Sequence, residues 1–184
     1  FGESLKNLEN PILNTSDCWT NVEDGPGAAT VKYYMPDGAK VSARNSSTNS
    51  STGYSGASGN NFLWFGTAGE LVVGDISVHP KLSGVKISFG LQRSEYQATD
   101  NNIKPEEFPV WVSKDGKSWV PLSYAVTAPG NGTWSLCSGS FSFDAGSIDR
   151  IWLRMCPTKT SAYRFDDLKV SNSSAGDRLD WSKK

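Results

Sequence analysis

The 184-residue chain has little of what enzymes commonly use for chemistry. It contains one histidine, His79, and three cysteines, so neither a histidine-based metal cluster nor a triad chosen from several histidines can be assembled. His79 directly precedes Pro80, a context typical of a turn. The adjacent acids Glu106 and Glu107 would point apart on a strand, which does not suit the two cooperating carboxylates of glycoside hydrolysis. We therefore expect a protein that is not an enzyme.

Charge and hydrophobicity exclude two further classes. The 18 basic and 19 acidic residues give a net charge of −1, without the clustered basic face that nucleic-acid binding needs. No apolar run approaches the roughly 20 residues that span a bilayer. The chain starts at Phe1 rather than at Met, so we expect a processed or trimmed chain. We expect a monomer without a nucleic-acid or membrane partner.

The scarcity of cysteine limits covalent cross-linking. Cys18, Cys137 and Cys156 allow at most one intramolecular disulfide bond. Cys137 and Cys156 lie in two successive predicted strands and could face each other, whereas free buried thiols are the alternative. The spacing alone leaves both interpretations open.

What the chain does have is a series of short segments with the pattern of β-strands. In residues 84–91 apolar and polar side chains alternate, as expected for an antiparallel strand with one buried face. Asp115-Gly116 lies between two runs rich in Val and Trp and predicts a tight hairpin. About ten strands without a convincing amphipathic helix predict an all-β fold, an antiparallel β-sandwich. The segments are residues 29–35, 40–44, 61–65, 70–78, 84–91, 110–113, 118–120, 122–126, 134–143, 150–156 and 163–170.

The rest of the chain is polar loop. Residues 45–61 are rich in Ser, Asn and Gly, and residues 92–108 form a second polar segment long enough to be functional. We interpret residues 1–170 as a single jelly-roll β-sandwich domain and residues 171–184 as a polar C-terminal tail.

Two carboxylates interrupt the last predicted strand. At a period of two, Asp166 shares a face with Leu168, whereas Asp167 points to the opposite face. If Leu168 faces the core, Asp166 is buried with it, and a buried carboxylate needs a partner. The partner could be Arg164 or another arginine, backbone N–H groups or a bound Ca²⁺.

Aromatic residues are the strongest signal for a ligand. The chain has seven tryptophans, and an indole face can stack on a sugar ring, although a sandwich core also consumes aromatic side chains. We expect about two-thirds of the tryptophans to be structural. Trp64, Tyr96 and Trp134 lie beside Gly- or Asn-rich loops and are candidate ligand residues. The polar candidates, which could bond sugar hydroxyls, are Arg93, Asp100 and Asn102.

Five short motifs follow one another in a characteristic order: Phe1-Gly2 and residues 53–61, 85–91, 113–119 and 163–168. In this order they resemble jelly-roll accessory domains of secreted bacterial proteins. Such domains are similar to carbohydrate-binding modules and galactose-binding-like domains, and are often appended to hydrolases or nucleases. The resemblance covers roughly residues 1–170. It implies a secreted, periplasmic or cell-surface location.

The resemblance also implies a structural calcium ion. In such jelly rolls an aspartate on the final strand often holds Ca²⁺ with help from the N-terminal segment. Asp166 is the matching position, and Glu3 is the candidate for a second ligand. Ca²⁺ takes six to eight oxygen ligands, so other groups must contribute.

Together these features predict a non-catalytic carbohydrate-binding module of an exported bacterial protein. We expect it to bind a polysaccharide or other glycan at a loop edge or concave face that includes Tyr96 and Trp134. The alternative is a structural or adhesion domain that supports a neighbouring catalytic domain or protein partner and has no small-ligand site.

Overall fold

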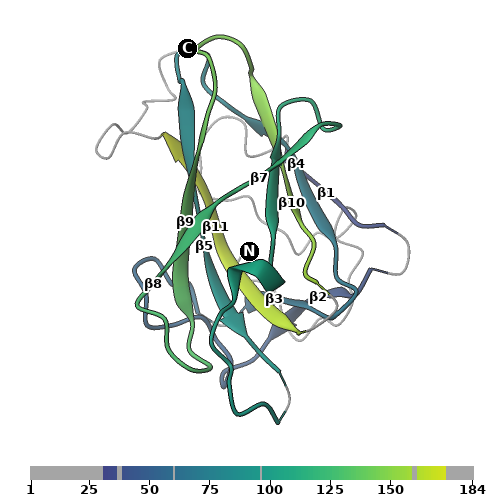
Figure 1. Cartoon of the computed structure of the whole chain (residues 1–184), viewed down its shortest axis with the longest axis vertical. Coiled ribbons are helices and arrows are strands. Elements are labelled where there is room, and N and C mark those ends of the chain that lie inside the picture. The colour runs from purple at the N-terminus through teal and green to yellow at the C-terminus, as the bar shows by residue number, and fades with distance from the viewer. Residues whose placement is uncertain (1–30, 37–38, 60, 96, 159–160, 173–184) are drawn as a thin grey trace.

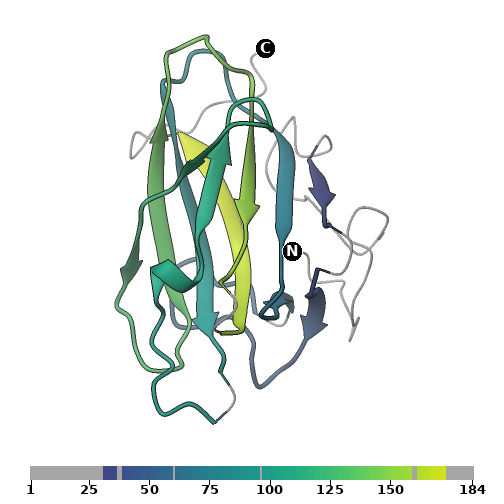
Figure 2. The ribbon, with the colours of Figure 1, turned by 45° about the vertical axis from the view of Figure 1, so that its right-hand side comes forward.

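The computed structural model describes residues 31–36, 39–59, 61–95, 97–158 and 161–172, and this part of the chain is an all-β fold. Eleven strands form two antiparallel sheets that face each other (Figures 1 and 2). The predicted antiparallel β-sandwich is therefore confirmed. Within the same ranges, no helix is both long and apolar enough to cross a membrane.

Strands that are distant in the sequence are neighbours in both sheets, as in a jelly roll. The five-stranded sheet has the order β1 (Lys32–Tyr34), β4 (Leu71–Ser77), β10 (Arg150–Met155), β6 (Val110–Ser113) and β7 (Trp119–Pro121). The six-stranded sheet has the order β2 (Val41–Asn45), β3 (Asn61–Phe65), β11 (Tyr163–Asn172), β5 (Gly84–Arg93), β9 (Ser135–Ser142) and β8 (Tyr124–Thr127). A single-turn 3₁₀ helix, η3 (Pro105–Glu107), precedes β6.

The core lies between the inner faces of the two sheets. Leu63 on β3, Phe165 on β11 and Leu91 on β5 are directly paired and have no exposed surface. Phe165 contacts the rings of Phe89 and Phe108 at centroid distances of 5.2 and 5.9 Å. Burying each such side chain contributes roughly 1.5–3 kcal/mol. A one-residue slip of these strands would expose the whole row, so the core fixes the register.

A β-bulge changes the phase of β11. Its pairing with β5 shifts between Asp166 and Lys169, and Asp167 has a φ of 51°. Before the bulge Asp166 pairs with Gly90 on the outer face, whereas after it Val170 pairs with Ile87 on the core side. The prediction that Asp166 shares a face with the core side of this strand is therefore wrong. Asp166 is fully buried, but on the outer face.

The bulge also corrects the expected divergence of the two acids. Ser58 contacts both carboxylates, through its hydroxyl to Asp166 at 3.4 Å and its backbone N–H to Asp167 at 3.2 Å. Both side chains therefore face the same segment, residues 46–59. The strand predicted to stop at residue 170 continues to Asn172, and the rest of the predicted tail lies outside the described residues.

Cys137 and Cys156 are both free thiols. Cys137 is buried in β9 of the six-stranded sheet, where burial raises the pKa of its thiol to about 12. Cys156 follows β10 of the five-stranded sheet, and its Sγ lies 3.9 Å from a carboxylate oxygen of Glu70. Of the two interpretations left open by the sequence, the free thiols are the one observed. Cys18 lies outside the described residues.

Candidate functional site

The outer face of the six-stranded sheet carries a transverse row of polar and aromatic side chains. Strand pairing places Ser42 on β2, Trp64 on β3, Arg164 on β11 and Gln92 on β5 directly beside one another. Directly paired residues project to the same side of a sheet, and so does Arg44, two positions after Ser42. We call these five residues the arginine strip.

Each guanidinium of the arginine strip is held by a neighbouring side chain. Arg44 donates from Nε to the Ser42 hydroxyl at 3.1 Å, and its Cζ lies 4.2 Å from the centroid of the Trp64 ring. Arg164 donates from Nη1 to Oε1 of Gln92 at 2.9 Å. Gln92 in turn donates from Nε2 to the Gly132 carbonyl at 2.7 Å. Both cations are therefore positioned before any ligand arrives.

Neither cation is paired with an acid of the described chain. Among the described residues, no carboxylate forms an ion pair with Arg44 or Arg164. Burial, and then the nearby charge of Arg44, lowers the pKa of the Arg164 guanidinium. Both arginines are half-buried, and the described residues leave the positive charge of the arginine strip without an ion pair.

The centre of the same face is filled by the chain itself. The ring centroids of Phe62 on β3 and Trp134 beside β9 are 6.0 Å apart. Two strands, β11 and β5, lie between β3 and β9, so the two backbones are separated by about 14 Å, or three strand spacings. The two rings therefore lean toward each other over a curved sheet. Gly90 lies beneath, where any Cβ would clash with the Tyr54 hydroxyl.

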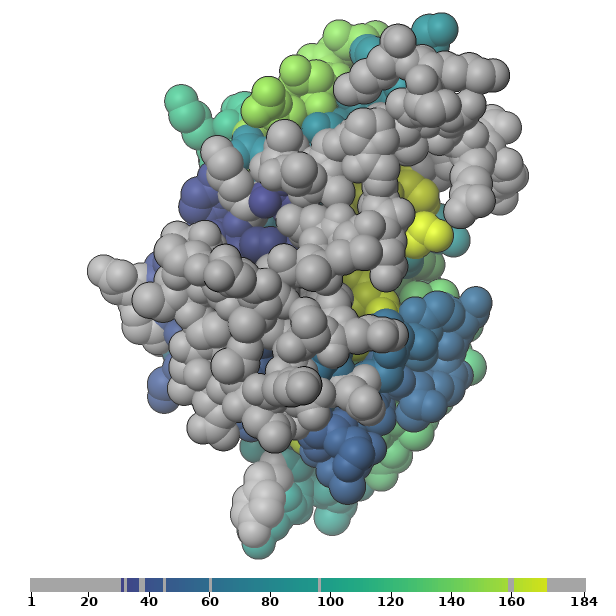
Figure 3. Space-filling view, turned by 180° about the vertical axis from the view of Figure 1, so that it is seen from behind, coloured from purple at the N-terminus to yellow at the C-terminus, as the bar shows by residue number. Residues whose placement is uncertain are grey.

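The segment 46–59 closes this central region. It lies beside β11 on the face seen in Figure 3. Its Asn49 carbonyl accepts a hydrogen bond from the Trp134 indole N–H at 3.1 Å, and Tyr54 packs near the Trp134 ring. Phe62 and Trp134 are only 2% and 6% exposed. Beside this covered centre, Arg44, Trp64, Gln92 and Arg164 of the arginine strip are partly exposed.

The predicted ligand residues fall into different environments. Trp64 is partly exposed within the arginine strip, whereas Trp134 is buried and packs against Tyr54 and Phe62. Tyr96 and Glu3 lie outside the described residues. Among the five tryptophans that the structure describes, Trp134 alone is buried, and the partly exposed ones are Trp64, Trp111, Trp119 and Trp152.

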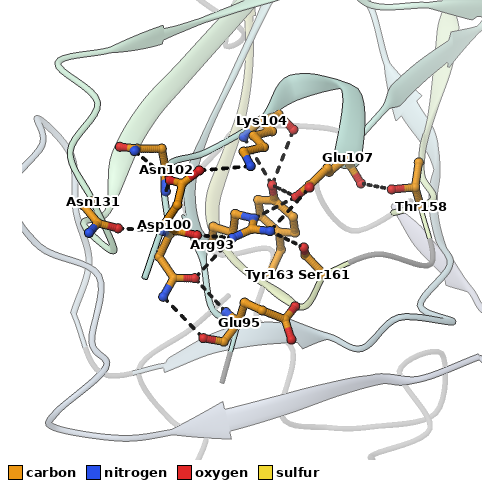
Figure 4. Close-up of polar contacts among 11 residues, drawn as sticks. Arg93, Glu95, Asp100, Asn102, Lys104, Glu107, Asn131, Thr158, Ser161 and Tyr163 are labelled. Atoms are coloured by element: carbon orange, nitrogen blue, oxygen red, sulfur yellow. Dashed lines mark hydrogen bonds and ion pairs between the residues drawn. The ribbon is translucent and has the colours of Figure 1, made fainter. Parts of the chain in front are cut away.

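Arg93 belongs to a buried network that fastens the loops at the end of the sandwich (Figure 4). Its Nε donates to Glu107 Oε2 at 2.8 Å and its Nη2 to the Ser161 hydroxyl at 2.7 Å. Tyr163 also donates to Glu107 Oε2, at 2.8 Å. A third nitrogen, Nη1, bonds the Asp100 carbonyl. Arg93 therefore joins β5, η3 and the loop before β11.

The other two predicted polar residues are exposed and bond each other. Asp100 Oδ1 accepts hydrogen bonds from the backbone N–H and the side-chain amide of Asn102 at 3.0 and 2.7 Å. Its other carboxylate oxygen, Oδ2, lies 3.0 Å from Lys104 Nζ. The Asn102 N–H, followed by Lys104, lowers the pKa of Asp100 to about 2. These residues shape the loop, whose Asn101 carbonyl accepts a hydrogen bond from the N–H of Gly132 at 3.0 Å.

Sequence reasoning missed Arg44, Arg164 and Gln92 as one site. Arg44 and Arg164 come from strands at opposite ends of the chain and meet only because β2 and β11 both pair with β3. The signal that could have found them is their alternation with core residues: each arginine lies next to a residue that faces inward, Ala43 and Phe165 respectively.

Of the two predicted calcium ligands, Asp166 lies beside Asp167 at the bulge, and Glu3 lies outside the described residues. The Ser51 hydroxyl donates to Asp166 Oδ2 at 2.7 Å and the Asp167 N–H to Oδ1 at 2.9 Å, while Tyr54 and Ser58 donate to Asp167. Burial, and then the Asp167 charge, raises the pKa of Asp166. Adjacent carboxylates and hydroxyls are the oxygen donors that Ca²⁺ prefers. In the described residues no cluster contains three or more His, Cys, Asp or Glu side chains.

No family model and no curated protein sequence matches the chain, but solved structures resemble it. The CBM22-1 xylan-binding domain of Paenibacillus barcinonensis Xyn10C is 17% identical, with a TM-score of 0.45 over 78% of this chain and 86% of that one. The K1 cleaved adhesin domain of Lys-gingipain from Porphyromonas gingivalis is 15% identical, with a TM-score of 0.48 over 79% and 92%. TmCBM61, in complex with β-1,4-galactotriose, is 12% identical, with a TM-score of 0.44 over 80% and 95%.

The resemblance to carbohydrate-binding modules that the sequence motifs indicated is thus found again among solved structures. At these identities and TM-scores the neighbours assign neither a ligand nor a site to this chain.

The Glu107 carboxylate is expected to make the fold sensitive to acid. Burial disfavours its ionisation, but hydrogen bonds from Arg93, Tyr163 and Ser161 outweigh burial and lower the pKa of Glu107. Its contribution is therefore complete above the unfolded value of about 4.3 and is lost as the pH falls through the lower folded value.

Glu107→Gln is expected to lower the free energy of unfolding at pH 7 by about 3 kcal/mol, because it leaves the Arg93 charge unpaired. It should also flatten the decline in stability below about pH 5. Urea unfolding at several pH values measures both effects, with the exposed neighbour Glu106→Gln as control. Parallel pH profiles for Glu107→Gln and the wild type would contradict the assignment.

We propose that Asp166 holds a structural calcium ion; EDTA is then expected to lower the melting temperature, because Asp166 and Asp167 would lose the cation that offsets their repulsion. Asp166→Asn should melt at the same temperature with and without EDTA, whereas the exposed-site control Asp144→Asn should keep the wild-type response. Differential scanning calorimetry of calcium-loaded and EDTA-treated protein tests this. A wild-type melt that EDTA does not change would eliminate the calcium ion.

Proposed function

We propose that this chain is a non-catalytic glycan-binding module whose binding site is the arginine strip. A sugar ring needs an aromatic surface and a few fixed groups that hydrogen-bond its hydroxyls. Trp64 supplies a partly exposed indole, and Arg44, Arg164 and Gln92 supply polar groups beside it. The observation that carries the proposal is this side-by-side arrangement across four paired strands.

The position on strands supports recognition of an extended ligand. Side chains that project from paired strands are held more precisely than side chains on loops. The strip crosses β2, β3, β11 and β5 and ends at the loop of Gly132. A polysaccharide chain could therefore lie across the strands and contact the strip along its length.

The acidic residues of the described chain support binding without a chemical step. Glu107 is bonded to Arg93 and Tyr163, and Asp166 and Asp167 are bonded to the segment 46–59. Each of these carboxylates has a structural use. The secreted, periplasmic or cell-surface location and the monomeric state inferred from the sequence belong to the same proposal.

One observation favours the alternative, a structural or adhesion domain. On the outer face of the five-stranded sheet, the rings of Tyr34 and Trp152 meet over Gly74, where a Cβ would lie 2.9 and 2.7 Å from them. Tyr34 is 44% exposed. Trp119 lies on the same side, since Trp152 and Trp119 both pair with Ser113. A partner protein could pack on these rings, because aromatic side chains are enriched in protein interfaces.

Glycan arrays and affinity gels with immobilised polysaccharides separate the two functions. Trp64→Ala is expected to weaken retention about tenfold, which corresponds to roughly 1.4 kcal/mol of lost ring contact. The matched control Trp152→Ala, on the opposite face of the sandwich, should bind like wild type. Wild-type retention by Trp64→Ala would contradict the site, and no retention of the wild type on any polysaccharide would favour the adhesion domain.

A further inference from the structure

The described arginines divide into two groups by their partners. Three of the five have a carboxylate within 4 Å: Arg93 pairs with Glu107, Arg150 with Asp75 and Asp149, and Arg154 with Glu70. The other two, Arg44 and Arg164, have none in the described part of the chain. These two are also the ones that share the arginine strip. The chain has 19 acidic residues and a net charge of −1, yet no acid of the described ranges is paired with these two arginines.

The described residues use only a minority of the hydrogen-bond donors of this pair. A guanidinium carries five N–H donors. Arg44 uses Nε on Ser42, and Arg164 uses Nη1 on Gln92; the described residues accept no other hydrogen bond from either. The remaining donors are held in place by the bonds that are made and by the stacking of Arg44 on Trp64.

The two guanidinium groups lie over two different aromatic rings of β3. Arg44 and Arg164 come from β2 and β11, which flank β3 on either side at about 4.8 Å each. Arg44 lies over Trp64, and the Cζ of Arg164 lies 5.8 Å from the centroid of the Phe62 ring. A sugar ring placed against Trp64 would therefore have a cation on either side.

The acids of this face do not compete for the cations. Asp166 has no exposed surface and is bonded to Ser51, while Asp167 is bonded to Tyr54 and Ser58. Both are directed to the segment 46–59, as described above. The positive charge of the arginine strip thus remains available to a ligand.

We propose that the glycan bound by the arginine strip is acidic, a polysaccharide with uronic acid residues whose carboxylates pair with Arg44 and Arg164. This inference rests on the proposed glycan-binding function and names the class of glycan. A neutral sugar would leave two half-buried cations unpaired, whereas a carboxylate accepts two parallel N–H bonds from one guanidinium. Such charge-assisted pairs are about twice as strong as neutral hydrogen bonds.

The decisive comparison uses one protein and two ligands that differ only in charge. Isothermal titration calorimetry with oligogalacturonate and with its fully methyl-esterified form is expected to show about ten- to a hundredfold tighter binding of the acid. The difference should shrink as salt is raised. Equal affinities would overturn the inference and leave glycan binding standing. Failure to bind these oligomers, alginate, glucuronoxylan and every neutral glycan would overturn both.

Substitutions assign the effect to the two arginines. Arg44→Gln and Arg164→Gln should each lose about tenfold or more in affinity for the uronate and a smaller factor in affinity for the methyl ester, which loses neutral hydrogen bonds alone. Arg164→Lys, which keeps the charge but loses the planar fork, should fall between Arg164→Gln and wild type. Arg150→Gln, an exposed position on the other sheet, removes the same charge and should bind like wild type.

Two results would overturn the assignment of the ligand class. One is a loss of uronate binding in Arg150→Gln as large as in Arg164→Gln, which would indicate attraction by net charge alone. The other is that the wild-type protein binds dextran sulfate, which has no carboxylate, but binds none of the uronates. This result would assign the strip to sulfate esters. Melting curves of each variant establish that the comparison is made between folded proteins.

Discussion

The bulge in β11 is the constraint on which the outer face of the six-stranded sheet depends. Before the bulge, the strand places Tyr163 and Phe165 in the core and Arg164 outside. An unbroken period of two would then turn Leu168 and Val170 outward. The left-handed conformation of Asp167 shifts the phase, so that both apolar residues pack against the core. One strand thereby serves the core on both sides of the bulge and still presents Arg164 and Asp166 on the outer face.

The same bulge decides which part of the outer face is open. It brings both carboxylates against the segment 46–59, and Gly90 leaves room for Tyr54 above the sheet. The segment and the aromatic rings beneath it cover the centre. On β11 the arginine strip lies two residues before the covered centre: Arg164 pairs with Trp64 of the strip, and Asp166 pairs with Gly90 beneath Tyr54. Closure of the centre and access to the strip therefore have a common origin.

The fold could be read from the sequence because it depends on local patterns. Alternation in residues 84–91 and the Asp115-Gly116 turn determine a strand and a hairpin without reference to the rest of the chain. The site depends on strand pairing, which alternation does not reveal. Arg44 and Arg164 become neighbours through β3, and Trp134, beside a Gly-rich loop, is buried because the segment 46–59 folds back over it.

The sequence did not predict the bulge in β11 either. A positive φ is uncommon outside glycine, although Asp tolerates it better than most residues, so Asp167 gave no local signal of a change in phase. Arg93 shows the converse case. It stands at the start of a polar loop, as a ligand residue would, yet it is buried and its donors are used on Glu107, Ser161 and the Asp100 carbonyl. Sequence position identifies a polar side chain near a loop, but only packing shows whether its donors are already bonded.

The contrast between Arg93 and the strip arginines separates stability from recognition. Removing either partner of Arg93 and Glu107 leaves a buried charge alone, so this pair binds the loops to the sandwich. Arg44 and Arg164 form no such pair with the described residues, and burial, followed by the charge of Arg44, lowers the pKa of the Arg164 guanidinium. Among the described residues, Arg93, Arg150 and Arg154 are paired with carboxylates. The neighbours Arg44 and Arg164 are not, so positive charge accumulates at the arginine strip. A bound carboxylate would neutralise this positive charge. Arg93 therefore stabilises the fold, whereas Arg44 and Arg164 serve ligand binding.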